Sequence, residues 1–142
     1  MYALSTGTYT KAELRRLDGF QAKCLRSILQ IPLSQYSRVS NETVREKAAS
    51  KSASKQLREQ QLIFLGKVLR SDEDSVLQTV SFIPGTMQPT TCRYIRRVGR
   101  PRKEWMAEVL PDALRIVGGE QNLKRIVQQS AQWKRVVKMG TA

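Results

Sequence analysis

Apolar residues recur every three or four positions in the first part of the chain. A capping box of Thr10 and Glu13 precedes them, and Pro32, which cannot continue a helix, follows them. The spacing predicts a first helix over residues 10–30. Its expected packed face carries Leu14, Leu17, Cys24, Leu25 and Ile28.

Further segments with helical spacing lie between residues 40 and 82. Ser40 or Asn41 can cap a short helix over residues 42–48. A longer helix is predicted over residues 54–70. Its apolar positions are Leu57, Phe64, Leu65 and Val68. Residues 76–82 fit either a short helical turn or a strand.

The C-terminal part is also predicted to be helical. Pro101 suits the first turn of a helix, and Gly118 with Gly119 ends the pattern. Pro111 either breaks this helix or begins a second short one. A last helix over residues 120–138 has apolar residues on one side and basic and amide residues on the other.

One long stretch, residues 83–100, has no periodic apolar pattern. It contains Pro84, Gly85, Pro89 and Gly99, and therefore predicts a loop. Loops of this length in a small domain are usually functional or disordered. We therefore expect an all-α fold of about five to six helices, in one domain over residues 1–142, with this loop preceding C-terminal helices at 101–138.

The net charge of the chain limits the classes of binding partner that we expect. The chain has 25 Lys and Arg against 12 Asp and Glu, a net charge of +13. Such a surface attracts polyanions, because each cation that meets a phosphate releases a condensed counterion. Nucleic acid is the favoured partner. No apolar run approaches the roughly 18 residues of a membrane-spanning helix, so no membrane span is expected.

The amino-acid composition excludes most kinds of metal site and catalytic site. The chain has no histidine and two cysteines, Cys24 and Cys92, so a zinc site and a histidine-based mechanism are not expected. Cys24 is expected to pack as a small apolar side chain. The acidic cluster Asp72, Glu73 and Asp74 is interpreted as a solvated loop in preference to a metal site. We expect no metal, no cofactor and no enzymatic activity.

A basic segment within and after the predicted loop is the main binding candidate. It carries six cations and no acid: Arg93, Arg96, Arg97, Arg100, Arg102 and Lys103. Tyr94 is a candidate for stacking on a base. The core Gly99-Arg100-Pro101 resembles an AT-hook, although Val98 stands where that motif prefers a cation. Three interpretations stay open: a simple turn into the next helix, nonspecific phosphate contact, and minor-groove recognition.

Two helix faces are further candidates for phosphate contact. The first helix carries Lys11, Arg15, Arg16, Lys23 and Arg26, and the last carries Lys124, Arg125, Lys134, Arg135 and Lys138. Either set could instead be the solvated side of an amphipathic helix. Trp105 and Trp133 occupy apolar helical positions and are expected in the core.

Several segments in order, "LRRLDGFQAKCLRSILQIP", "RVSNETVRE", "QLIFLGKVLRSDED", "VGRPRKEWMAEV" and "SAQWKRVV", resemble the region after the thumb in non-LTR (LINE-type) retrotransposon reverse transcriptases. The resemblance covers about residues 2–138. It implies a region that holds template RNA or target DNA, with the basic segment foremost and Arg15, Arg16 and Arg26 next. The polymerase core and its paired aspartates are missing, and Lys67 stands where many family members have a histidine.

The first hypothesis is therefore a noncatalytic nucleic-acid-binding domain derived from such a retroelement. It contacts RNA or DNA phosphates through the Arg-rich loop, with RNA the more expected partner, and binds by shape more than by sequence. The alternative is a structural subunit of a large assembly, such as an organellar ribosome or another organellar complex, with protein neighbours. The sequence does not fix the compartment; both hypotheses agree with a protein of the nucleus or of an organelle.

Overall fold

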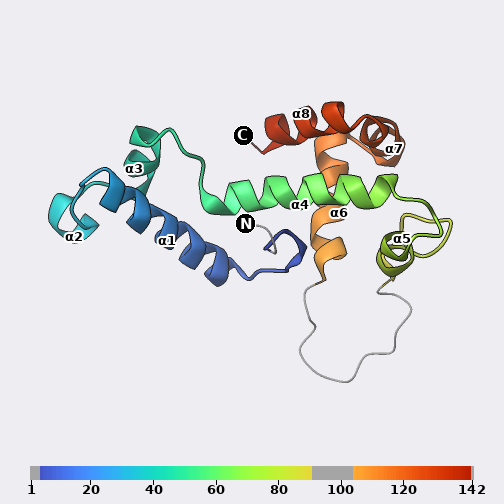
Figure 1. Ribbon diagram of the computed structural model, residues 1–142, viewed down its shortest axis with the longest axis horizontal. Helices are drawn as coiled ribbons and strands as arrows, with labels where there is room; N and C mark the ends of the chain where they lie inside the picture. The colour runs from blue at the N-terminus through green and yellow to red at the C-terminus, as the bar shows by residue number, and fades with distance from the viewer. Residues whose placement is uncertain (1–3, 91–103, 142) are drawn as a thin grey trace, which may run out of the picture. The chain divides into compact units, whose positions relative to one another are not determined.

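A computed structural model describes residues 4–90 and 104–141 (Figure 1). The all-α prediction is confirmed: within these ranges the chain forms helices, and its β-structure is limited to an isolated bridge between Phe82 and Pro89. A short 3-10 helix at Leu4–Thr6 is followed by α1 (Lys11–Ile28), α2 (Ser34–Ser37), α3 (Asn41–Lys47), α4 (Ala53–Arg70), α5 (Val76–Ser81), α6 (Trp105–Val117), α7 (Glu120–Gln128) and α8 (Ser130–Gly140).

The chain forms two compact units, a division that leaves the expectation of one domain over residues 1–142 as a prediction. One unit, here the N-terminal unit, is Tyr9–Arg58. The other, here the C-terminal unit, combines Met1–Thr8 with Glu59–Ala142. The C-terminal unit is therefore discontinuous in sequence. The Trp105 indole N–H donates to the Ser5 carbonyl at 2.8 Å, and the Gln61 amide donates to the Gly7 carbonyl at 2.9 Å.

The N-terminal unit packs α1 against α3. The predicted capping box is present: the Glu13 backbone N–H donates to Thr10 Oγ1 at 3.2 Å, and the Thr10 N–H donates to Glu13 Oε2 at 2.7 Å. The predicted packed face is wrong at Cys24, which is exposed, and at Ile28, which is 75% exposed. The packed face runs instead through Ala22, with Leu25 half-buried beside it.

Polar residues on the packed face of α1 hold the start of α4. Asp18 Oδ1 accepts the Ser54 N–H at 2.8 Å, and Gln21 Oε1 accepts the Ala53 N–H at 2.7 Å. The first N–H groups of a helix have no partner within it, so these side chains satisfy them. This explains why the packed face of α1 is less apolar than its periodicity predicted.

In the C-terminal unit, α6 begins at Trp105, because Glu104 before it has an extended backbone. The prediction of a helix start at Pro101 is therefore wrong, and Pro101 itself lies outside the described residues. Pro111 does not end the helix: α6 continues through it to Val117. Proline removes one backbone hydrogen bond, but Val109, Leu110 and Ala113 around it are buried and hold the helix in place. Gly118 ends α6 in the left-handed conformation (φ 75°), as predicted.

The predicted single helix over residues 120–138 is also wrong, because Gln129 adopts an extended conformation between α7 and α8. The apolar pattern explains the break. Val127 and Trp133 are both buried. In one continuous helix, six residues correspond to a rotation of about 240°, so the two side chains would point about 120° apart. Two shorter helices allow each to bury its own apolar side.

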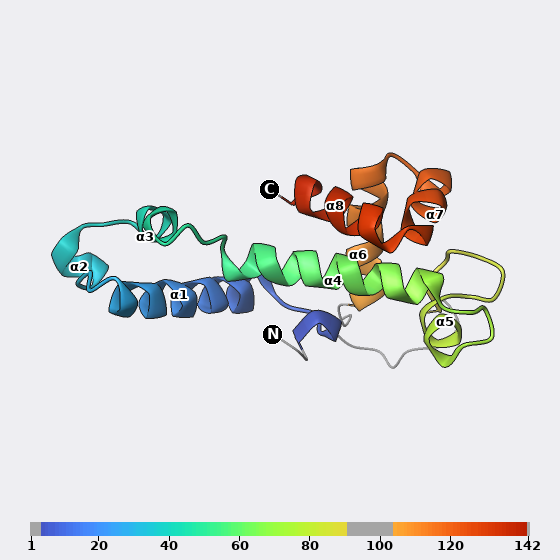
Figure 2. The same cartoon turned by 45° about the horizontal axis from the view of Figure 1, so that its top comes forward.

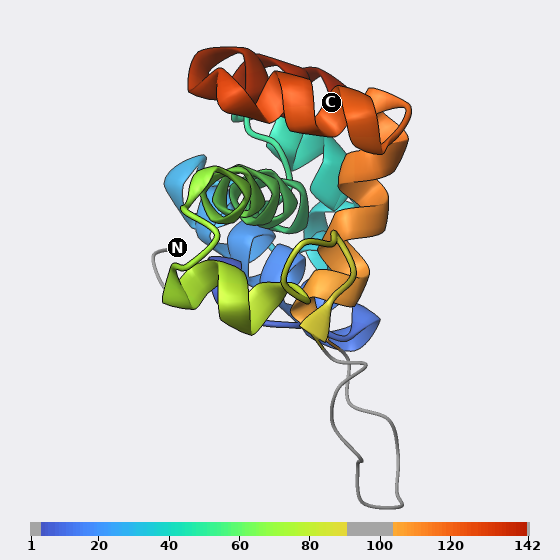
Figure 3. The same ribbon diagram turned by 90° about the vertical axis from the view of Figure 1, so that its right-hand side faces the viewer.

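The core of the C-terminal unit lies between α4 and the three C-terminal helices. Its fully buried side chains include Leu62, Leu65, Val109, Leu123, Val127, Trp133 and Val137. In Figures 1 and 2, α8 runs beside α4. Figure 3, which looks along α4, shows α8, α6 and α5 on different sides of it. This helix is thus the centre around which the C-terminal unit is built.

Candidate nucleic-acid interface

The main binding candidates from the sequence, the six cations of residues 93–103 and Tyr94, lie outside the described residues. The candidates that the structure describes lie on helix faces of the two units, and each face is considered by itself. Arg15 and Arg16 on α1 are exposed, as phosphate contact requires.

Arg26, in contrast, is a correction to the sequence prediction. It is only 4% exposed, so its guanidinium is not available to phosphate. Its Nη1 donates to the Pro32 carbonyl at 2.9 Å, and its Nη2 donates to Asn41 Oδ1 at 3.1 Å and to the Val39 carbonyl. A buried guanidinium needs such acceptors, because an unpaired buried charge is strongly destabilising. Arg26 therefore holds the segment between α1 and α3, with α2 inside it.

The surface of α7 and α8 retains its predicted basic character. We call it the cationic face, and it consists of the exposed side chains of Lys124, Arg125, Lys134, Arg135 and Lys138. The packed sides of these helices bury Leu123 and Val127 in α7 and Trp133 and Val137 in α8. At about 100° per residue, Arg125, Arg135 and Lys138 lie away from the core, and Lys124 and Lys134 lie at the edge of the packed side. The break at Gln129 therefore keeps both basic segments in solvent.

Few partners neutralise this face. Lys124 Nζ lies 3.0 Å from Glu120 Oε1, one turn earlier in α7. Exposed pairs of this kind contribute little stability, so Lys124 can exchange its partner for phosphate. Within the described ranges, Lys134, Arg135 and Lys138 form no ion pair or hydrogen bond through their side chains. No acid follows Glu120 in the sequence.

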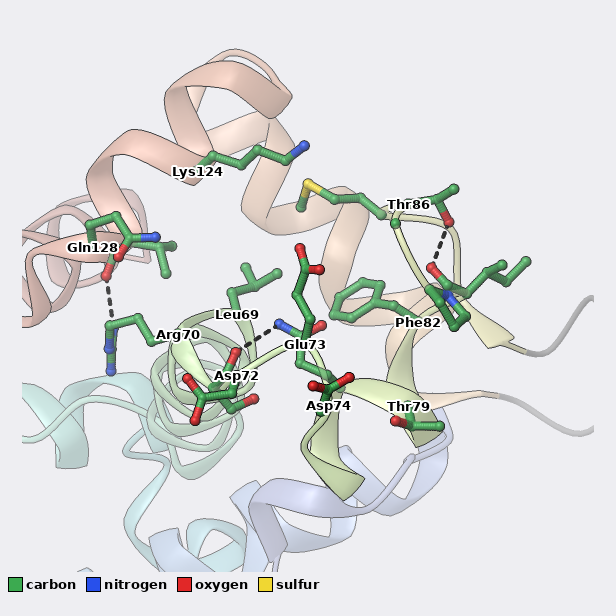
Figure 4. A pocket seen from close by; sticks show the side chains of 17 residues that line it. Leu69, Arg70, Asp72, Glu73, Asp74, Thr79, Phe82, Thr86, Lys124 and Gln128 are labelled. Carbon is green, nitrogen blue, oxygen red and sulfur yellow. Dashed lines mark hydrogen bonds between the residues drawn. The ribbon is translucent and has the colours of Figure 1, made fainter.

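A cavity of about 570 Å³ lies at the end of α4 (Figure 4). Asp72, Glu73 and Asp74 line part of it, and Lys124 lines another part. All three acids are exposed, which agrees with their interpretation as a solvated loop. Their negative charge would repel phosphate.

One exposed residue was missed in the sequence. Phe20 is 67% exposed on α1, although it is a large apolar residue. Its signal was present, because Phe20 stands four residues after Arg16 and three before Lys23, the spacing of neighbours on a helix surface.

Comparison with known proteins adds no relative: no family model, curated protein or solved structure matches the chain. In the described part of the chain, no helix combines the length and the apolar character needed to cross a membrane.

Proposed function

We propose that the protein is a noncatalytic nucleic-acid-binding domain that holds RNA, in preference to DNA, through its phosphates. The observation that supports this most strongly is the cationic face. Residues 120–141 contain five Lys and Arg and a single acid, Glu120, and all five cations are exposed. Each phosphate contact adds affinity through release of a counterion.

The cations of α8 stand on a helix that is held in place. α8 is fixed by Trp133, whose indole N–H donates to the Leu62 carbonyl of α4 at 2.9 Å. Lys134 and Lys138 are one turn apart, so they project from nearly the same side of α8 at about 6 Å along its axis. Cations on a fixed helix lose less freedom on binding than cations on a flexible chain.

We propose that the domain derives from the region after the thumb of a LINE-type reverse transcriptase, on the ordered segments that resemble that family. In such a domain the arginines of residues 93–103, Arg15 with Arg16, and the cationic face would each contact phosphates.

A second candidate function is a structural subunit of a large assembly. The observation that favours it is α5, on which Val76 and Val80 are 77% and 70% exposed and one turn apart. Neighbouring exposed apolar side chains are typical of protein contact surfaces.

A binding titration tests the proposed function directly. We expect the purified chain to bind RNA, with affinity falling by about three decades between 50 and 200 mM salt if roughly six cations contact phosphates. An affinity that stays flat over this range would show that phosphate contacts do not drive binding. Co-purification with a protein assembly that survives nuclease treatment would favour the second candidate.

A further inference from the structure

The solvent-facing side of α1 carries an aromatic ring between two cations. Arg16, Phe20 and Lys23 follow the i, i+4, i+7 spacing and therefore form one stripe along the helix. All three side chains are exposed, whereas Ala22 is buried on the packed side of the same helix. We call this set the aromatic stripe.

Phe20 differs from the other phenylalanines of the chain. Phe82 is buried in the core of the C-terminal unit, and Phe64 packs edge-on against Trp105 with ring centroids 5.5 Å apart. A single exposed apolar residue is common on protein surfaces and needs no explanation. An exposed ring with a cation one turn away on each side is a more specific arrangement, because it combines a stacking surface with charges for a nucleic-acid backbone.

The cations of the stripe are available for a ligand. Within the described ranges, neither Arg16 nor Lys23 forms an ion pair or a hydrogen bond through its side chain. The two acids of α1 do not counter them directly. Glu13 is hydrogen-bonded in the capping box, and Asp18 lies on the packed side, bound to Ser54.

We propose that the aromatic stripe binds single-stranded nucleic acid, with a base stacked on Phe20 and flanking phosphates held by Arg16 and Lys23. The proposal rests on the proposed function and narrows it to unpaired nucleotides at this surface. Along the helix axis the two cations lie about 6 Å and 4.5 Å from Phe20, so their long side chains reach the backbone on either side of one base. In a duplex the bases stack on one another and offer no free face to the ring.

The two basic surfaces are therefore assigned different tasks. Among the described residues of the C-terminal unit, Phe82 and Trp133 are buried and Phe64 and Trp105 are half-buried, so the cationic face has no exposed ring beside its charges. It can hold a backbone whether the strand is single or double. The aromatic stripe requires an unstacked base.

The test compares three probes by fluorescence anisotropy: an oligouridylate of roughly ten nucleotides, within the usual range of single-strand site sizes, an abasic strand of equal length, and an RNA duplex. Full-length wild type is compared with Phe20→Leu, which keeps an apolar side chain without the ring, and Phe20→Trp, which enlarges the ring. Tyr36→Leu is the matched control, because Tyr36 is an exposed ring on α2 of the same unit.

We expect Phe20→Leu to weaken binding of oligouridylate by about 5- to 100-fold and to leave the abasic strand and the duplex unchanged. Phe20→Trp should bind at least as tightly as wild type, and Tyr36→Leu should bind like wild type. Unchanged oligouridylate binding by Phe20→Leu, or equal losses on all three probes, would overturn the stacking proposal while the proposed function stands. Wild type that binds no probe would overturn both.

A protein contact is the rival role for Phe20. Sedimentation of wild type and Phe20→Leu separates the two roles. If the substitution abolishes self-association and leaves RNA binding unchanged, Phe20 is a protein anchor and the proposal is wrong.

Discussion

The indole of Trp133 occupies the space that a side chain at Gly66 would fill. A Cβ at residue 66 would lie 2.3 Å from Trp133 Nε1, well inside any permitted contact. The same indole N–H donates to the carbonyl of Leu62, one turn earlier in α4. The glycine therefore exposes a backbone carbonyl to the tryptophan, and this contact fixes α8 against α4.

Gly66→Ala should destabilise the C-terminal unit. Overpacking costs about 1–3 kcal/mol, and the better helix propensity of alanine returns up to about 1 kcal/mol, so we expect a net loss of about 1–2 kcal/mol. Both tryptophans lie in this unit, so tryptophan fluorescence during urea unfolding reports on it.

The matched control is Gly19→Ala on α1. A Cβ at residue 19 would meet no atom within 4 Å, so we expect only the gain in helix propensity, up to about 1 kcal/mol of added stability. Far-UV circular dichroism during thermal unfolding measures it. The same sign of change for both substitutions would contradict the role assigned to the contact between Gly66 and Trp133.

Arg26→Gln should destabilise the N-terminal unit, with its effect on RNA binding coming only through unfolding. The substitution removes the guanidinium that donates to the carbonyls of Pro32 and Val39. The Pro32 carbonyl keeps the Ser37 hydroxyl as a donor, so we expect the loss at Val39 to dominate a cost of about 1–3 kcal/mol. Arg15→Gln is the contrasting variant, because Arg15 is exposed. It should leave the melting transition within about 0.5 kcal/mol of wild type and weaken RNA binding. If Arg26→Gln weakened RNA binding without lowering stability, and Arg15→Gln lowered stability without weakening binding, Arg26 would be a binding residue after all.

Lys134→Gln combined with Lys138→Gln should reduce the salt dependence of RNA binding. Two lost phosphate contacts lower the slope of log affinity against log salt by about 1.4–1.8. The charge-preserving pair Lys134→Arg with Lys138→Arg should keep the slope. A second control, Arg38→Gln with Lys47→Gln, removes the same charge from exposed positions of the N-terminal unit. If this control lowers the slope equally, binding depends on net charge and not on the cationic face.

Neutralising the acidic loop should strengthen nucleic-acid binding. In Asp72→Asn, Glu73→Gln, Asp74→Asn we expect a few-fold higher affinity at low salt, because repulsion near Lys124 is removed, and the difference should vanish at high salt. The wild type should cleave neither RNA nor DNA with added Mg²⁺. Cleavage that the triple variant loses would instead identify these acids as a metal-dependent site.

Much of the helical framework could be predicted because its signals are local. The capping box at Thr10 and the glycine after α6 act over a few residues, so the sequence pattern is sufficient to find them. The break between α7 and α8 was not predicted, although the spacing from Val127 to Trp133 does not fit one helix face. The continuation of α6 through Pro111 was not predictable, because the packing of distant helices around it outweighs one lost hydrogen bond.

The candidate interface shows where local patterns stop being informative. A cation on an amphipathic helix was assigned to solvent, but Arg26 is buried because backbone carbonyls of later residues surround it, and carbonyls carry no sequence signature. Phe20 could be placed beside Arg16 and Lys23 from spacing alone. Its exposure could not be predicted without knowing which side of α1 is packed. That side includes the polar residues Asp18 and Gln21, because they accept the first N–H groups of α4.

The discontinuity of the C-terminal unit has a consequence for the order of events during synthesis. Residues 9–58 are complete as soon as they leave the ribosome, so their local contacts can form early. Residues 4–8 are made before them, yet their partners are Gln61 and Trp105, and the bond from Trp105 to Ser5 spans 100 positions. Residues 4–8 must therefore wait for α6, and the unit that carries the cationic face closes after the N-terminal unit.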